Sequence, residues 1–292
     1  MTDEADRYYS GSGAVPLRGT IIVLLGGALA IAGLSLLYSI AEFYVSHQKL
    51  KVLIALCYAM LVGGAVKLLS RFGAVRSRLF SGLLGLALGL FAVYSAWMWF
   101  LVILSGWNMQ VAGLSPTVMW EAIQALAGAG IWRNRNGIAV GATELAVWWS
   151  LEALAVIAAA TYMATTNREP YCEACGRWTE ASPIAALPPA PIEALKAELE
   201  DERYESLYRL GRQPLTPGAG LTAQVWTCRD CKESNFLTMS DVSVKVKGSE
   251  EKVTSTAFVQ HLLVPEEVAR WVRERDQHAV APAVDDPPIA QG

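Results

Sequence analysis

The chain has 292 residues, of which 53% are hydrophobic and 17% are charged. Soluble domains carry about 25% charged residues, so part of this chain avoids water. Residues 1–167 contain ten Lys or Arg and seven Asp or Glu, and therefore have a net charge of +3. The remaining fourteen Lys or Arg and twenty Asp or Glu lie in residues 168–292, which therefore have a net charge of −6. The acidic second part argues against nucleic acid as a partner, because phosphate contacts require clustered positive charge.

Four apolar stretches, each of a length suited to crossing a membrane, follow one another in the first part of the chain. A membrane-spanning helix needs about 20 predominantly apolar residues. The first stretch has no charge from Gly19 to Ala41, and its length and the acidic residues before it argue against a signal peptide. We expect a cytoplasmic tail over 1–17 and a transmembrane domain over 18–167, with spans at about 20–42, 52–70, 80–105 and 143–166.

The third predicted span contains a Gly-x-x-x-Gly spacing, formed by Gly85 and Gly89. Glycines permit two helix backbones to approach closely because they carry no side chain. This span is therefore a candidate for close packing against another helix of the membrane bundle.

The connection between the third and fourth spans predicts a further helix that does not cross the membrane. Ser115 followed by Pro116 is typical of a capped helix start with proline in the first turn. The stretch that follows is too short and interrupted for a span. We expect an interfacial or re-entrant helix at about 116–128.

Charge and tryptophan placement indicate the orientation of the chain. Four spans put both termini on one side, where eight flanking Lys or Arg residues lie against four on the other side, in agreement with the positive-inside rule. Seven tryptophans fall near the outer ends of the last two spans or between them: Trp97, Trp99, Trp107, Trp120, Trp132, Trp148 and Trp149. This clustering indicates an aromatic belt at one membrane interface or, alternatively, a tryptophan-lined pocket. The Ala-, Gly- and Arg-rich composition favours a bacterial source, hence the inner membrane with cytoplasmic N and C termini.

The fourth span contains a carboxylate, Glu152, which is costly inside a membrane and must be protonated, paired or hydrated. Trp148 and Trp149 precede it by four and three residues and share the neighbouring helix surface. One interpretation is a proton or cation site facing a bundle cavity. The other is a structural group bonded to another helix or paired with Arg133 or Arg135. Glu42 and Glu144 are expected at the membrane interface.

Two Cys-x-x-Cys pairs lie beyond the fourth span: Cys172 with Cys175, and Cys228 with Cys231. Four thiolates can close a tetrahedral zinc site, which persists in a reducing cytosol. The glycine directly after Cys175 suits the tight turn of a metal-binding knuckle. Two thiol–disulfide centres are the alternative, although redox pairs normally sit at a helix N-terminus. The fifth cysteine, Cys57, is expected to be a small buried hydrophobic side chain without chemistry.

Around these pairs the chain resembles a zinc ribbon, in which two Cys-x-x-Cys knuckles meet above short antiparallel strands. The resemblance implies a small α+β cytoplasmic domain over 168–277 with Zn²⁺ in a structural role. Fifty-two residues separate Cys175 from Cys228, against the usual 15–20. This insertion predicts one acidic amphipathic helical run within 190–211, which either packs on its own domain or docks a partner. We also expect strands over 221–227, 242–246 and 253–263. A helix that starts at Pro265 should turn Val268, Trp271 and Val272 toward the core, and the tail over 278–292 should be disordered.

The sequence contains no phosphate-binding loop, nucleophile elbow or His-Glu-x-x-His motif, which favours a non-catalytic protein over an enzyme. The leading hypothesis is a membrane-anchored, zinc-stabilised module that binds another protein as a scaffold or regulatory subunit. The second hypothesis is a small transporter or channel component that uses Glu152. The third is a membrane-tethered thiol oxidoreductase.

Overall fold

A computed structural model describes residues 7–45, 47–111, 115–129, 140–167, 169–210, 219–231, 233–247 and 250–279. The chain divides into two compact units. The helical unit is Ser12–Arg168, and the sheet unit is Met1–Gly11 together with Glu169–Gly292. Trp132, Arg133, Arg135 and residues 280–292 of the expected tail lie outside the described residues.

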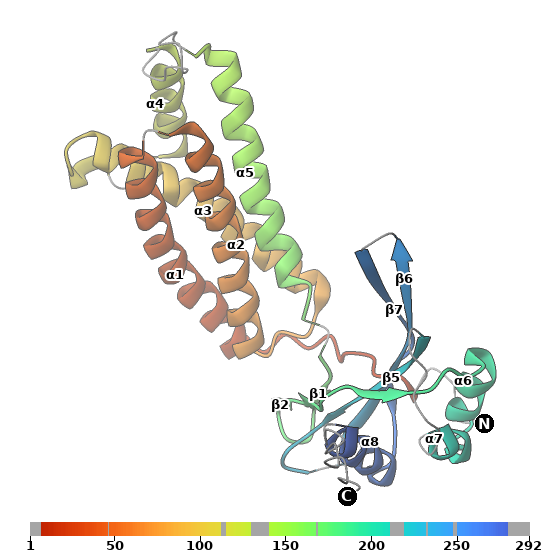
Figure 1. Cartoon of the computed structure of the whole chain (residues 1–292). Helices are drawn as coiled ribbons and strands as arrows, with labels where there is room; N and C mark the ends of the chain where they lie inside the picture. The colour runs from red at the N-terminus through yellow and green to blue at the C-terminus, as the bar shows by residue number, and fades with distance from the viewer. Residues whose placement is uncertain are drawn as a thin grey trace, which may run out of the picture. The chain divides into compact units, whose positions relative to one another are not determined.

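The helical unit is a bundle of four long helices (Figure 1). Each of the four is long and apolar enough to cross a membrane, with a mean hydropathy between 1.5 and 2.4 in its most apolar window. Their positions match the four predicted spans, with ends that differ by a few residues. The helices are α1 (Leu17–Tyr44), α2 (Gln48–Phe72), α3 (Arg78–Leu104) and α5 (Ala142–Ala164).

Large apolar side chains cover the outside of this bundle, and small polar ones lie inside it. Leu29 is 78% exposed and Leu37 is 65% exposed on α1, whereas Ser35 and Ser39 of the same helix are fully buried. The Ser39 hydroxyl donates to the Ala96 carbonyl oxygen at 2.8 Å. A water-soluble surface rarely exposes so many large apolar side chains, whereas a lipid-facing surface does.

Glycines allow α3 to approach α5 closely, as the Gly-x-x-x-Gly spacing predicts. A Cβ atom placed on Gly85 would lie 2.7 Å from the Ala160 carbonyl oxygen, and one on Gly89 would lie 3.0 Å from the Ile157 Cα atom. Both distances are shorter than ordinary van der Waals contact. The two helices therefore pack backbone against backbone at these positions.

The predicted helix between the third and fourth spans is present as α4 (Pro116–Gly128), after a single 3₁₀ turn, η2 (Met109–Val111). The Ser115 hydroxyl accepts a hydrogen bond from the Val118 N–H at 3.4 Å, and Pro116 occupies the first turn. In the described part of α4, Ile123 is the one buried residue. The helix is too short to cross a membrane by itself.

The sheet unit contains a five-stranded antiparallel sheet and a separate two-stranded hairpin. In the large sheet, β5 (Ala219–Thr227) pairs with β6 (Asn235–Lys247), and β6 pairs with β7 (Glu250–Leu263). The short strands β3 (Glu180–Ala181) and β4 (Ala185–Leu187) both pair with β5. The three predicted strands correspond to β5, β6 and β7, each of which begins earlier than expected.

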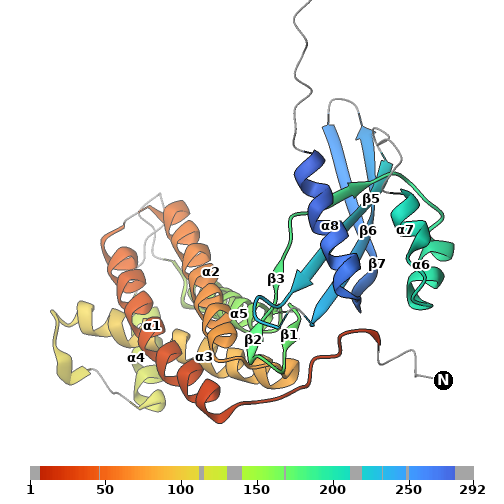
Figure 2. The same cartoon turned by 90° about the horizontal axis from the view of Figure 1, so that it is seen from below.

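Helices pack on this sheet and complete its core. The last helix, α8 (Glu266–Ala279), contacts β4, β5 and β6 (Figure 2). Val268 and Val272 of α8 are fully buried, as predicted, whereas Trp271 is only half-buried and packs edge-on against Tyr208. His278, expected to begin the tail, lies within α8.

The predicted helical run within 190–211 is two helices, which corrects the sequence interpretation. Helix α6 spans Ile192–Glu200, and after a turn helix α7 spans Glu205–Leu210. Glu202 adopts a left-handed conformation with φ +59°, and the Arg203 N–H donates to the Glu198 carbonyl at 2.8 Å. This is the hydrogen-bond pattern of a Schellman C-cap, formed here without the glycine that usually signals it.

The described residues 7–11 belong to the sheet unit, although the sequence interpretation assigned residues 1–17 to a separate tail. Tyr8 forms an antiparallel bridge with Leu262 of β7, and the Tyr9 N–H donates to the His261 carbonyl at 2.9 Å. A segment before the first helix of the bundle thus folds together with the part of the chain that follows the last one.

Candidate metal centre and membrane pocket

The first cysteine pair lies on a hairpin of two very short strands, β1 (Tyr171–Cys172) and β2 (Arg177–Trp178). Cys172 pairs with Arg177 across the hairpin. Gly176 has φ +66°, and its N–H donates to the Cys172 carbonyl at 2.9 Å. A side chain would strain this conformation, so the glycine after Cys175 has the turn-forming role that the sequence predicts.

The second cysteine pair lies in the connection between β5 and β6. The Cys228 N–H donates to the Ser234 carbonyl at 3.2 Å and closes the turn. The backbone N–H groups of Glu233 and Ser234 donate to the Cys231 sulfur. Because these hydrogen bonds favour the thiolate, they lower the pKa of Cys231 to about 6.

The two cysteine pairs converge on one place. All four sulfur atoms lie within 4.8 Å of one another, and the sulfurs of Cys172 and Cys231 are 3.6 Å apart. Cys172 and Cys228 are buried, whereas Cys175 and Cys231 are partly exposed. The fifth cysteine, Cys57 of α2, is exposed on the helical unit and not buried as the sequence interpretation expected. Hydrogen bonding to Cys231, with smaller effects of desolvation and of the other two cysteines, raises the pKa of Cys175 to about 12.

This cluster could hold a metal ion. A tetrahedral site with metal–sulfur distances of about 2.3 Å places its sulfurs about 3.8 Å apart, close to the spacing seen here. Soft thiolate ligands select soft divalent metals, and a set of four fills a tetrahedral ion. Among the residues that the structure describes, no other group of three or more His, Cys, Asp or Glu side chains has such an arrangement.

Two ion pairs connect the cysteine-bearing turns to their surroundings. The Arg177 guanidinium contacts the Asp230 carboxylate through two bonds, at 3.0 Å and 3.1 Å, and so joins the β1–β2 hairpin to the β5–β6 connection. Arg229 contacts Glu180 of β3 at 2.5 Å. Sequence reasoning missed both pairs, because the partners are about 50 residues apart and no local pattern relates them.

The shared cluster also bears on the redox hypothesis. Two thiol–disulfide centres would act as separate pairs, each exposed at a helix N-terminus. Here both pairs lie on hairpin turns and belong to one group of four sulfurs. The arrangement favours metal binding over redox exchange.

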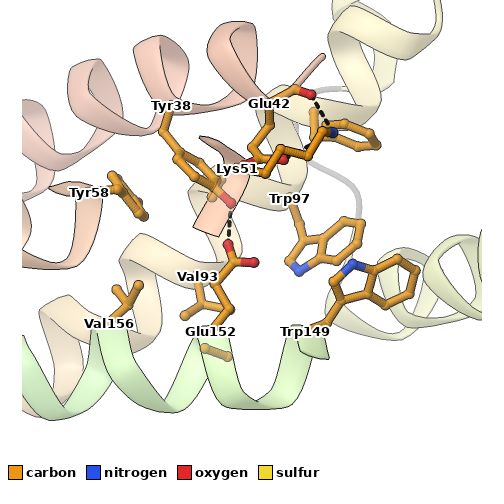
Figure 3. Close-up of a pocket in the computed structure, with 12 residues that line it drawn as sticks. Tyr38, Glu42, Lys51, Tyr58, Val93, Trp97, Trp149, Glu152 and Val156 are labelled. Carbon is orange, nitrogen blue, oxygen red and sulfur yellow. Dashed lines mark hydrogen bonds and ion pairs between the residues drawn. The ribbon is translucent and has the colours of Figure 1, made fainter. Parts of the chain in front are cut away.

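A second site lies within the helical unit, where all four long helices meet (Figure 3). The cavity has a volume of about 70 Å³, and Glu152 of α5 reaches into it. The Tyr38 hydroxyl of α1 donates to the Glu152 carboxylate. The Lys51 ammonium of α2 contacts the Glu42 carboxylate at 3.2 Å and donates to the Glu42 backbone carbonyl at 2.7 Å.

Aromatic rings form much of the wall of this cavity. Trp97 packs edge-on against Trp149 with their ring centres 5.0 Å apart, and Phe100 lies 5.9 Å from Trp97. On the other side Tyr38 stacks on Tyr58 at 4.4 Å. The Tyr58 hydroxyl is itself anchored, because it donates to the Ala92 carbonyl at 3.0 Å.

The structure separates the residues that the sequence had grouped around Glu152. Trp149 lines the cavity with Glu152, whereas Trp148 is 48% exposed on the outside of the bundle and does not line it. One residue corresponds to about 100° of helix rotation, which explains the difference. The bonding partner of Glu152 is Tyr38 of another helix, while Arg133 and Arg135 lie outside the described residues.

Sequence reasoning did not assign four of the polar and charged side chains of the cavity to it. Glu42 was expected at the membrane interface, and Lys51, Tyr38 and Tyr58 were not singled out. These four side chains are polar, lie within or beside a predicted span, and fall at about the same membrane depth as Glu152. That pattern could have predicted their contact with it.

Comparisons of the chain with protein-family models, with curated proteins and with solved structures give no match.

Proposed function

We propose that this chain is a multi-pass protein of a bacterial inner membrane that anchors a zinc-stabilised cytoplasmic module, and that this module binds another protein. The observation that carries the proposal is the convergence of Cys172, Cys175, Cys228 and Cys231 on one point of the sheet unit. The four apolar helices supply the anchor.

Zinc would act structurally in this module. The four cysteines would hold it, and the ion would cross-link the β1–β2 hairpin to the β5–β6 connection, which the Arg177–Asp230 ion pair also joins. A set of four sulfurs leaves no coordination position for a catalytic water. The two knuckles beside antiparallel strands support the zinc-ribbon resemblance, with the long sheet and three helices as additions to it.

The pairing of Tyr8 with Leu262 supports the proposed topology. It requires the segment before α1 and the unit after α5 to lie on the same side of a membrane, which an even number of crossings satisfies. The greater number of Lys and Arg on the side of the termini and the reduced state that free thiols need both support the cytoplasm as that side.

The outer face of α6 and α7 is the proposed docking surface. These helices bury Leu195, Leu199, Leu207 and Leu210 in the core of their own unit, so their apolar stripe is already used. Their exposed faces present Glu193 and Glu205 with further acidic residues between them. A partner with a basic surface complements this charge.

Metal analysis of the purified full-length chain tests the zinc assignment. One zinc per chain is expected in detergent solution, and a chelator should unfold the sheet unit while the membrane helices stay helical. A sheet unit that is folded and contains no zinc at equilibrium would overturn the assignment.

Charge reversal tests the docking surface. The double variant Glu193→Lys/Glu205→Lys should lose a protein that cross-links to the wild-type chain in its native membrane. The matched control Glu267→Lys/Glu274→Lys makes the same charge change on exposed positions of α8 and should retain that protein. Zinc content verifies that both variants are folded. Equal capture by both variants would reject the α6–α7 surface, and a wild-type chain that cross-links to nothing would reject docking.

A further inference from the structure

The cavity among the four long helices lies inside the bundle and is displaced toward one end of it. Glu152 is ten residues from the start of α5, which corresponds to about 15 Å along the helix. Tyr38 is six residues from the end of α1, and Lys51 is three residues from the start of α2. The cavity therefore extends inward from the end of the bundle at which α1 ends and α2 and α5 begin.

The charged groups of this cavity leave one negative charge to be balanced. Glu42 and Lys51 neutralise each other, and the Lys51 ammonium is further occupied by the Glu42 backbone carbonyl. Glu152 receives a hydrogen bond from Tyr38, and within the described part of the chain it forms no ion pair. A carboxylate in this setting is costly unless a cation or a proton accompanies it.

The aromatic wall indicates which kind of cation fits. Trp97 and Trp149 form one side of the cavity, with Phe100 packed against Trp97, and the stacked rings of Tyr38 and Tyr58 lie on the other side (Figure 3). Aromatic faces attract organic cations, tryptophan most strongly, and retain them when water is excluded. An inorganic cation such as Ca²⁺ instead requires about six to eight oxygen ligands, and a proton needs no aromatic wall at all.

We propose that the helical unit binds a small organic cation, an alkylammonium ion, between Glu152 and the rings of Trp97 and Trp149. The carboxylate supplies the opposite charge, and the rings replace the water around the alkyl groups. The cavity volume of about 70 Å³ restricts the buried part of the ligand to a few heavy atoms. This binding site goes beyond protein docking by the zinc module and does not depend on it.

Titration of the full-length chain in lipid nanodiscs with tetramethylammonium chloride tests the site, with potassium chloride at the same ionic strength as the reference. Saturable heat at one ligand per chain is expected for tetramethylammonium, and none for potassium. The complex should also unfold at a higher temperature than the free protein, because the ligand binds the folded state.

Two matched pairs of variants on α5 locate the bound ion. Glu152→Gln removes the charge but keeps the shape and should weaken binding by about tenfold or more, whereas Glu144→Gln makes the same change at an exposed position and should leave Kd unchanged. Trp149→Leu should weaken binding by about 2- to 30-fold, the range of cation–π contributions, whereas Trp148→Leu should have no effect. Trp149→Phe, which keeps a ring, should retain most of the affinity.

The outcomes separate the possible occupants. Absence of saturable binding by the folded wild-type chain would overturn the proposal and leave the cavity as a structural feature. Saturable potassium binding, abolished by Glu152→Gln and indifferent to Trp149→Leu, would also overturn it in favour of an inorganic cation. Equal loss of binding in both tryptophan variants would show that the ion sits elsewhere.

Discussion

Substitution of Gly85 by alanine tests the close approach of α3 and α5. The new Cβ atom would lie 2.7 Å from the Ala160 carbonyl oxygen and 2.9 Å from the Ala164 Cβ atom. Ordinary contact begins near 3.4 Å, so the helices would have to separate by several tenths of an ångström, or the backbone would have to shift. Overpacking of this kind typically costs about 1–3 kcal/mol, and we expect Gly85→Ala to lower the free energy of unfolding by that amount.

The control is a glycine of the same bundle that has space around it. A Cβ atom on Gly64 of α2 would meet no atom within 4 Å. Gly64→Ala should therefore be neutral or stabilise the helix by up to about 1 kcal/mol, since alanine has the higher helix propensity. Unfolding in detergent, followed by circular dichroism at 222 nm, measures both. Equal destabilisation by the two variants, or a Gly85→Ala protein as stable as the wild type, would refute the packing argument.

Three further predictions concern the sheet unit. Cys172→Ser should abolish stoichiometric zinc binding, measured by elemental analysis, and the sheet unit of this variant should no longer show a cooperative unfolding transition. Full zinc occupancy in the variant would contradict the proposed ligand set. Arg177→Ala should lower the free energy of unfolding of the sheet unit by only about 0.2–1 kcal/mol in chemical unfolding, because the ion pair of Arg177 with Asp230 is about half exposed. A loss of several kcal/mol would show that the sheet unit requires this ion pair to fold. Burial lowers the pKa of His261 below its usual value near 6.5, so the unfolded chain takes up the proton first, and stability that is present above about pH 6.5 should fall as the pH decreases toward 5. His261→Asn should remove this pH dependence of the free energy of unfolding, because asparagine tolerates the positive φ of this position but does not titrate. An unchanged pH dependence would assign it to other groups.

Local features of the chain could be predicted from the sequence. The four membrane-type helices follow from long, predominantly apolar runs, because a helix that crosses lipid needs about 20 such residues. The start of α4 follows from Ser115 and Pro116, and the first cysteine turn follows from Gly176, because caps and tight turns depend on adjacent residues. Each of these signals lies within a few positions of the structure that it specifies.

Only the tertiary structure decided which residues meet. Tyr38 and Glu152 bond across 114 positions, and Arg177 and Asp230 bond across 53, distances over which one sequence contains no pairing signal. The division of the insertion at Glu202 also required the structure, because a left-handed residue other than glycine has no sequence signature. The membrane pocket is the clearest case. Whether Trp148 or Trp149 faces it depends on how α5 is rotated against three other helices, and that rotation is set by packing between all four.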